Sequence, residues 1–367
     1  MKIGILTMDY KKNYGGILQC YGLYKYLMSE GHDVKVIDFK NTGKRSLINY
    51  LSKIKDIKAH LPKKKAVNTN NTKPLSKRYL QNFVDFRNDY LQYTEPVNEN
   101  GLSRLCVQFD AVVVGSDQIW NDINTHKLAY YFDWKYDGLK IAYAPCTIFS
   151  KAPLLLRSKI KGLLSRFDLL TARDSNTAQY VESFGLASPD IVVDPSCLYD
   201  YRDLLGGNPI GEPYILTYIL GSEINGGNKE VIKHIKKLVG DIRVVSVCIP
   251  SVSTVCENIS DAVYYDASPI DWVNLFYHAS FVFTDSFHGC MFSMKFQKPF
   301  IAYYKESSRQ SRMLDLIQRF ELKNIIVNSA AVGEFKTLES LVNYSTLNEK
   351  LSDAINKSTE LLHQSIR

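Results

Sequence analysis

The sequence predicts an α/β protein built from two Rossmann-like, doubly wound domains that face a cleft, with a C-terminal helix that returns toward the first domain. Apolar runs of strand length alternate with helical patterns, which is typical of parallel sheets covered by helices. The chain has 367 residues, more than one hydrophobic core usually holds. A Gly/Pro-rich break at 206–213 interrupts the alternation. We therefore expect an N-terminal domain over residues 1–205 and a C-terminal domain over residues 213–367.

The first half carries the pattern of a parallel sheet. Its strand-like apolar runs are Lys2–Met8, Val34–Phe39, Asp110–Val114, Ile141–Ala144, Asp168–Ala172 and Ile191–Val193. Apolar residues at helical spacing predict helices over Ile17–Ser29, Tyr79–Tyr90 and Ser175–Phe184. We expect Gly31 to end the first helix and Asp174 or Ser175 to cap the third.

The second half repeats the same alternation. Strands are expected at Tyr214–Leu220, Val244–Ile249, Phe281–Phe283 and Pro299–Tyr304. Helices are expected at Lys229–Leu238, Asp271–His278, from about Ser311 to Phe320, and from Leu338 to His363. A further helical pattern follows the polar turn Thr284–Gly289.

Composition indicates an ordinary globular protein, with 45% hydrophobic and 23% charged residues. The N-terminal apolar run is too short for a signal peptide, and no apolar run reaches the length of a membrane span. The seven cysteines are scattered, with no C-x-x-C pair. This pattern favours reduced thiols over a disulfide framework or a zinc site, and so a cytoplasmic protein.

Positive charge is concentrated between residues 40 and 80. This stretch holds twelve Lys or Arg residues against one acidic residue, Asp56, while the whole chain carries a net charge of +7. This segment is either a solvated surface loop or a segment that binds an anionic partner. The anionic partner would be a membrane surface carrying a lipid-linked glycan, or a phosphorylated substrate. Nucleic acid is not expected, because no recognisable binding module accompanies the charge.

The turn Thr284–Gly289 is the strongest candidate for a functional site. It follows an apolar strand and precedes a helix, and ligands of parallel sheets bind at the carboxyl ends of strands. Ser286, His288 and Gly289 place a hydroxyl, an imidazole and a flexible backbone there. Because imidazole titrates near neutral pH, His288 is the candidate for proton transfer.

Two turns in the first half are candidates for binding. The segment 13–19 (NYGGILQ) opens a helix whose N-terminus suits an anion, and Asn13, Gly15 and Gly16 lie in it. It lacks the G-x-G-x-x-G spacing of a dinucleotide site, although Asp38 follows the second strand. The segment 115–121 (GSDQIWN) follows another strand. Asp117 would be a helix cap, a sugar-hydroxyl acceptor or a base. Trp120 would stack on a sugar or lie in the core.

Three cationic side chains are candidates for holding anions. Arg173 ends a strand, and its planar donor fork suits a carboxylate or a phosphate. Lys305 follows the strand Phe300–Tyr304, and Arg312 lies in the next helix, with Arg309 as its alternative. Lys305 and Arg312 are equally compatible with a solvated basic surface. For Arg173 the alternative is a surface pair with Asp174, which would contribute little. For Asp194, Asp-Pro turn chemistry is the preferred interpretation.

These segments together resemble the polysaccharide pyruvyl transferase family over most of residues 1–320. The matches are NYGGILQ at 13–19, GSDQIWN at 115–121, TARD at 171–174, DPS at 194–196, SFHG at 286–289 and SRMLDLI at 311–317. The resemblance implies a GT-B-like transferase that moves pyruvate from phosphoenolpyruvate to a pair of sugar hydroxyls in a surface polysaccharide precursor. No metal or redox cofactor is implied.

The resemblance also implies roles for the candidate residues. His288 would transfer a proton, while Arg173, Lys305 and Arg312 would hold the donor. Asp117 and Gln118 would recognise the acceptor, which is a sugar or a lipid-linked glycan. Ser286, Gly289, Asn13, Gly15 and Gly16 complete the implied binding residues.

One departure from the family pattern keeps two other functions open. Family members often have Arg two residues before the histidine, where this chain has Ser286. The alternatives are a glycosyltransferase that uses a nucleotide-sugar and a non-catalytic glycan-binding or assembly protein.

Overall fold

The computed structural model describes residues 1–8, 13–40, 74–121, 127–151, 154–305, 307–328 and 344–366, without the side chains of residues 127 and 307–309. Most of the basic segment 40–80, including Lys63, Lys64 and Lys65, lies outside the described residues. The chain divides into two compact units. Unit 1 comprises Met1–Lys65, Tyr90–Tyr199 and Ala354–Arg367, and unit 2 comprises Ala66–Asp89 and Asp200–Asp353.

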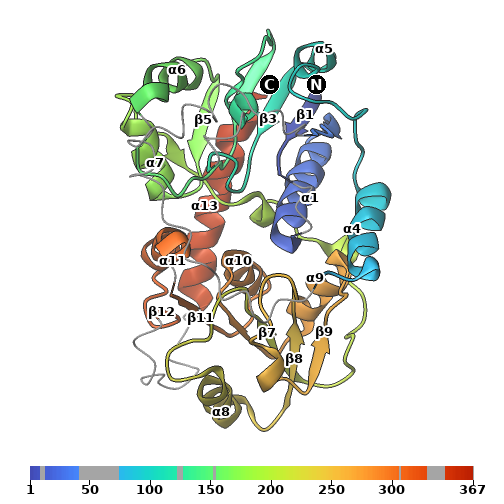
Figure 1. Cartoon of the computed structure of the whole chain (residues 1–367). Coiled ribbons are helices and arrows are strands. Elements are labelled where there is room, and N and C mark those ends of the chain that lie inside the picture. Colours follow the sequence, from blue (N-terminus) through green and yellow to red (C-terminus); the bar gives the residue numbers. More distant parts are fainter. Residues whose placement is uncertain are drawn as a thin grey trace. The chain divides into compact units, whose positions relative to one another are not determined.

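Unit 1 contains a six-stranded parallel sheet in the order β2-β1-β3-β4-β5-β6. Strands β1, β3 and β5 of this sheet are labelled in Figure 1. Its strands are β1 (Lys2–Leu6), β2 (Asp33–Val36), β3 (Ala111–Val114), β4 (Leu139–Ala142), β5 (Leu169–Ala172) and β6 (Asp190–Ile191). Its helices are α1 (Tyr14–Ser29), α5 (Leu102–Cys106), α6 (Leu154–Leu164) and α7 (Ser175–Glu182). The register is continuous along the central pair, where Ile3 faces Ala111 and Leu6 faces Val114.

Unit 2 contains a second six-stranded parallel sheet, in the order β12-β11-β10-β7-β8-β9. Its strands are β7 (Tyr214–Tyr218), β8 (Arg243–Val247), β9 (Ala262–Tyr264), β10 (Phe281–Thr284), β11 (Phe300–Tyr304) and β12 (Ile326–Asn328). Its helices are α4 (Lys77–Tyr90), α8 (Asn228–Val239), α9 (Pro269–His278), α10 (Phe287–Lys295) and α11 (Ser307–Phe320). Helix α4 ends at Tyr90, the first residue of the second segment of unit 1. The two sheets confirm the predicted pair of Rossmann-like, doubly wound domains.

Local sequence explains where several helices begin. Asp174 caps α7 by accepting the Thr177 N–H at 2.8 Å, as expected. Ser268 and Asp271 form a reciprocal capping box at α9, followed by Pro269 at a position that needs no amide hydrogen. Each pairing satisfies amide groups that the helix itself leaves without partners.

Each unit has its own buried apolar core. In unit 1 the core includes strand residues such as Val112 and Val114 and a group of aromatic side chains around Trp120. In unit 2 it joins strand residues such as Ile215 and Phe283 to the apolar face of α8. Buried apolar area is the main favourable term in folding, so each sheet has a hydrophobic core of its own.

The C-terminal helix α13 (Tyr344–Ser365) returns to the first domain, as predicted. From Ala354 onward it belongs to unit 1. Ser358 accepts the Val193 N–H at 3.0 Å, and Lys357 forms an ion pair with Asp190 at 2.6 Å. None of the described helices is both long enough and apolar enough to cross a membrane.

Two short strands and one longer helix were not predicted from the sequence. Strands β9 and β12 are only three residues long, and each lies at an edge of its sheet. Helix α6 was also missed, although Ile160, Leu163 and Leu164 are buried. Exposed Leu154 and Leu155 at its start obscure the periodicity that would have indicated it.

A disulfide between Cys248 and Cys256 corrects the expectation that all thiols are reduced. The sequence did not reveal this pair, because the two cysteines are eight residues apart and come together only where the chain between them turns back. The other five cysteines form no disulfide and are buried. By chain entropy, a bridge closing so short a loop contributes about 2–3 kcal/mol to the free energy of unfolding.

Thiol titration of the denatured protein without reductant is expected to find five free thiols out of seven. Prior treatment with a dithiol should raise the number to seven and lower the unfolding midpoint. Seven thiols before reduction would contradict the bridge.

Candidate functional site

The candidate residues of unit 1 gather where the strand order of its sheet reverses. The chain passes from β1 to β2 on one side and then to β3 on the other, so the ends of β1 and β3 flank the switch point. Ligands of doubly wound sheets bind at such points. Asn13, Gly15 and Gly16 follow β1 and begin α1, and Asp117 and Gln118 follow β3.

The start of α1 lies close to Asp117. Asn13 is the N-cap and accepts the Gly15 N–H at 3.0 Å. A Cβ added to Gly16 would lie 3.3 Å from the Met8 carbonyl oxygen and 3.9 Å from Asp117 Oδ2. The glycine therefore lets the helix backbone approach the Met8 carbonyl, while the Asp117 carboxylate lies at ordinary contact distance.

The segment after β3 is an irregular turn. Asp117 has φ of 68°, a left-handed conformation that is uncommon for a residue other than glycine. No α-helix follows through Asn121, so the helix-cap interpretation of Asp117 is wrong. Gln19 holds this turn by accepting the Ser116 N–H at 3.1 Å while donating to Thr7 Oγ1 at 3.0 Å. Backbone strain held by buried hydrogen bonds is a frequent property of functional sites.

Arg173 directly follows β5, and its side chain is 1% exposed. Its guanidinium donates to Asp194 Oδ2 at 2.7 Å, to Cys146 Sγ at 2.8 Å and to Asp117 Oδ1 at 3.4 Å. Burial alone would lower the pKa of Arg173, but Cys146, Asp194 and Asp117 together raise it. The surface pair of Arg173 with Asp174 is therefore wrong, because Arg173 is buried and its ion pairs are with Asp194 and Asp117.

Two other side chains of unit 1 have structural positions. Trp120 is fully buried, stacks on Tyr131 with ring centroids 5.0 Å apart, and donates to the Tyr130 carbonyl at 3.2 Å. It is therefore a core residue and does not present a face to a sugar. Asp194 accepts the Ser196 N–H at 3.0 Å, which is the expected turn chemistry, and also carries the ion pair with Arg173.

The candidate residues of unit 2 gather at the equivalent switch point, between β7 and β10. Ser286 is the N-cap of α10 and accepts the Gly289 N–H at 3.3 Å. His288 lies in the first turn of the helix and is 6% exposed. This is the predicted strand–turn–helix arrangement, with the imidazole at the carboxyl end of β10.

Gly289 permits close packing of α10 on the strand before it. A Cβ at this position would lie 2.5 Å from Thr284 Oγ1, closer than atoms can approach. Thr284 is itself held by donating to the Tyr218 carbonyl of β7. The glycine thus sets the distance between the first turn of α10 and the end of β10.

Arg312 and Lys305 reach this region from neighbouring elements. The Arg312 guanidinium carbon lies 5.7 Å from the ring centroid of Phe287, the residue between Ser286 and His288. Lys305 is exposed at the end of β11 and donates to the Glu223 carbonyl at 3.1 Å. The side chain of Arg309 lies outside the described residues.

Sequence reasoning did not assign roles to Asp285 and Cys146. Asp285 is 4% exposed, and its Oδ1 accepts the Leu220 N–H at 2.6 Å. Its position directly after β10 was a usable signal, because carboxylates there can hold a neighbouring loop. Cys146 touches Arg173, and nothing in the sequence indicated that contact. Within the described ranges, no group of three or more His, Cys, Asp or Glu side chains is arranged to hold a metal ion.

Solved structures resemble the chain in fold at low sequence identity. A putative UDP-N-acetylglucosamine 2-epimerase from Listeria monocytogenes has a TM-score of 0.50 at 13% identity, with 97% of this chain and 90% of that chain covered. UDP-GlcNAc 2-epimerase from Neisseria meningitidis bound to UDP-GlcNAc gives 0.47 at 11% identity, covering 100% and 99%. E. coli heptosyltransferase WaaC with ADP gives 0.40 at 11% identity, covering 98% and 99%. The first of these likenesses agrees with the fold described above.

Family membership comes from the sequence. No curated protein matches the chain at a significant level. The family model described as polysaccharide pyruvyl transferase matches residues 13–307, a span that begins at Asn13 and includes Asp117, Arg173 and His288. Since that span is well over half of the 367 residues, the chain belongs to the polysaccharide pyruvyl transferase family.

Proposed function

We propose that the protein transfers pyruvate from phosphoenolpyruvate to two neighbouring hydroxyls of a sugar in a surface polysaccharide precursor, forming a cyclic ketal. The observation that carries this proposal is the position of His288. Its imidazole lies in the first turn of α10, at the switch point of the unit 2 sheet, with Arg312 over the adjacent Phe287. A proton-transfer group beside a cation and a helix N-terminus suits an anionic enol ether.

The reaction needs one proton to be placed and one leaving group to be stabilised. Protonation of the methylene carbon of phosphoenolpyruvate by His288 makes the adjacent carbon electrophilic. A sugar hydroxyl adds to that carbon, and His288, neutral after the first step, takes up its proton as the new C–O bond forms. The neighbouring hydroxyl then closes the ketal as the C–O bond to phosphate breaks, and its proton leaves with the phosphate. Overall, one diol and one phosphoenolpyruvate give one ketal and one phosphate.

Arg312 compensates for Ser286 in this proposal. Ser286 provides no positive charge where family members often have Arg, but its hydroxyl caps α10. The Arg312 guanidinium lies over the ring of Phe287, which belongs to the same turn, and so places a positive charge near it. Lys305, at the end of the adjacent strand β11, supplies the second cation for the phosphate and carboxylate of the donor.

The unit 1 residues are assigned to the acceptor. Asp117 and Gln118 are both partly exposed at the switch point, and each carries an oxygen that can accept from sugar hydroxyls. Arg173 is assigned to holding Asp117 in place, because its fork already binds Asp194 and Asp117. The acceptor is proposed to be a sugar or a lipid-linked glycan in the cytoplasm.

Binding of phosphoenolpyruvate tests the proposal. At ten times its dissociation constant, the donor should stabilise the protein by about 1.4 kcal/mol and raise the melting temperature by a few degrees. The rise should be lost in Arg312→Met and Lys305→Met. It should persist in Arg166→Met, which changes an exposed arginine elsewhere.

Nucleotide-sugars provide the opposing outcome. A shift with UDP- or ADP-sugars and none with phosphoenolpyruvate would replace pyruvyl transfer by glycosyl transfer. Calorimetric titration with each ligand would then give the affinity directly.

A further inference from the structure

We propose that Ser253, in the disulfide-closed turn after β8 (residues 248–256), is a positioning residue that sets the β7–α8 loop and through it Lys305. The inference rests on the proposed function, in which Lys305 holds the anionic donor. Ser253 belongs to none of the segments that resemble the family. Its role follows from a series of contacts along the carboxyl edge of the unit 2 sheet.

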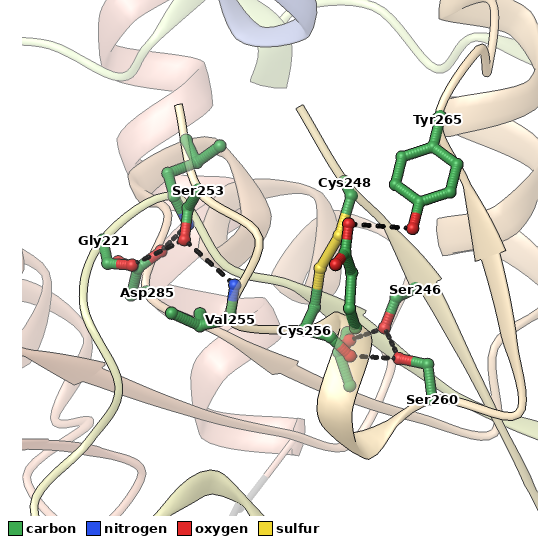
Figure 2. The surroundings of a disulfide bond; sticks show 12 residues. Gly221, Ser246, Cys248, Ser253, Val255, Cys256, Ser260, Tyr265 and Asp285 are labelled. Carbon is green, nitrogen blue, oxygen red and sulfur yellow. Dashed lines mark hydrogen bonds between the residues drawn. A yellow bond between two sulfur atoms is a disulfide. The ribbon is translucent and has the colours of Figure 1, made fainter. Parts of the chain in front are cut away.

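The disulfide-closed turn is short and covalently closed. Cys248 follows β8, and its disulfide to Cys256 closes the turn between them (Figure 2). Inside the turn the Ser253 N–H donates to the Ile249 carbonyl at 3.0 Å. Ser253 is 7% exposed, whereas its neighbour Val252 is 38% exposed. The serine therefore points inward from a short, restrained loop.

Ser253 is bonded to the loop that follows β7. Its hydroxyl donates to the Gly221 carbonyl at 2.8 Å, and Figure 2 shows this bond beside the disulfide. Residue 220 of the same loop is held from the other side, because Asp285 accepts its N–H at 2.6 Å. The disulfide-closed turn after β8 and the turn after β10 thus form hydrogen bonds with adjacent residues of one loop.

The next two carbonyls of the loop are also bound by side chains. The Tyr303 hydroxyl donates to the Ser222 carbonyl at 3.0 Å, and Lys305 donates to the Glu223 carbonyl at 3.1 Å. Three consecutive carbonyls therefore accept side-chain hydrogen bonds. The donor to residue 221 comes from the disulfide-closed turn, the donor to residue 222 from β11, and the donor to residue 223 from the residue after β11. Two residues separate the carbonyls of 221 and 223, and the neighbouring bonds at 220, 222 and 223 restrict their φ and ψ angles, so a displacement at 221 affects the carbonyl of 223.

This arrangement gives Ser253 an effect on Lys305 without contact between them. A lysine side chain has many rotamers, and an exposed one loses much conformational freedom when it binds a ligand. The bond to the Glu223 carbonyl restricts Lys305 before the donor arrives. Without the Ser253 bond, the loop would hold that carbonyl less firmly, with only the bonds of Asp285 and Tyr303 left nearby, and Lys305 would bind the donor less well.

Kinetics with a double-mutant cycle test the coupling. Ser253→Ala is expected to raise KM for phosphoenolpyruvate about five-fold, the effect of one buried hydrogen bond, while kcat and the acceptor KM stay within two-fold. In a Lys305→Met background the same substitution should change nothing further. An equal rise in both backgrounds, or no rise in either, would overturn the proposal.

The matched control is Ser260→Ala. Ser260 lies in the same region, donates to the Cys256 carbonyl and is hydrogen-bonded to Ser246 of β8, and neither bond involves the β7–α8 loop. Its substitution should leave KM for phosphoenolpyruvate unchanged. A rise in KM equal to that of Ser253→Ala would show a general loosening of the disulfide-closed turn and would contradict a specific role for Ser253.

Hydrogen exchange gives a readout that does not depend on activity. Ser253→Ala, and Cys248→Ala/Cys256→Ala as a second variant, should speed exchange in peptides covering 219–227, while Ser260→Ala should affect only 246–264. Unchanged exchange at 219–227 in both variants would overturn the positioning role. If the wild type binds no phosphoenolpyruvate but the loop responds as expected, the proposed function fails while the structural coupling stands.

Discussion

Replacing His288 with asparagine is expected to lower kcat for pyruvyl transfer by about 10²–10⁴-fold. Asparagine keeps a polar side chain in the first turn of α10 but cannot supply a proton near neutral pH. Because Ser286 still caps the helix and Gly289 still packs on Thr284, the fold should be retained. The measurement is phosphate release in steady state, together with the melting temperature of each variant.

His234→Asn is the control for this variant. His234 lies on α8, is half-buried and has no assigned role in the reaction, so its loss should leave kcat unchanged. Similar losses in both variants would point to instability and not to proton transfer. Full activity in His288→Asn would remove the histidine from the mechanism. Binding of glycan without turnover in the wild type would favour the non-catalytic alternative.

Replacing Arg173 with methionine is expected to cost unit 1 about 3–5 kcal/mol in free energy of unfolding. The substitution leaves the Asp194 carboxylate, which is fully buried, without its cation, and it also releases Asp117. An unpaired buried charge is far more costly than a missing surface pair. Denaturant unfolding followed by circular dichroism would measure the loss.

A compensating variant separates this explanation from a packing defect. Arg173→Met/Asp194→Leu removes both charges and should recover part of the stability, because no buried carboxylate is left uncompensated there. Arg166→Met, at an exposed position, should stay within about 0.5 kcal/mol of the wild type. No recovery in the double variant would show that the ion pair is not the source of the loss.

Arg173→Lys then tests the assignment of Arg173 between its two roles. If Arg173 positions Asp117, the folded lysine variant should keep the melting-temperature rise with phosphoenolpyruvate and show a raised KM for the acceptor. Loss of the phosphoenolpyruvate response with an unchanged acceptor KM would restore the expected role of Arg173 as a direct donor contact.

Motifs at strand ends were the most predictable part of the site. Asp117, Arg173, His288 and Lys305 were identified because a strand precedes each of them, and parallel topology places strand ends at one edge of a sheet. The partners of these residues were less accessible. Arg173 was expected to face a ligand, yet Asp194, which lies 21 residues farther along the chain, accepts its hydrogen bond.

The sequence by itself determined the alternation of strands and helices, the two Rossmann-like domains and the family, because these depend on local periodicity and short motifs. Tertiary structure decided the burial of Trp120, the ion pairs of Arg173 and the pairing of Cys248 with Cys256. It also brought Ser253 to Gly221 and Lys305 to Glu223. Such contacts depend on how loops at neighbouring strand ends meet, and no periodicity in the chain encodes that distance.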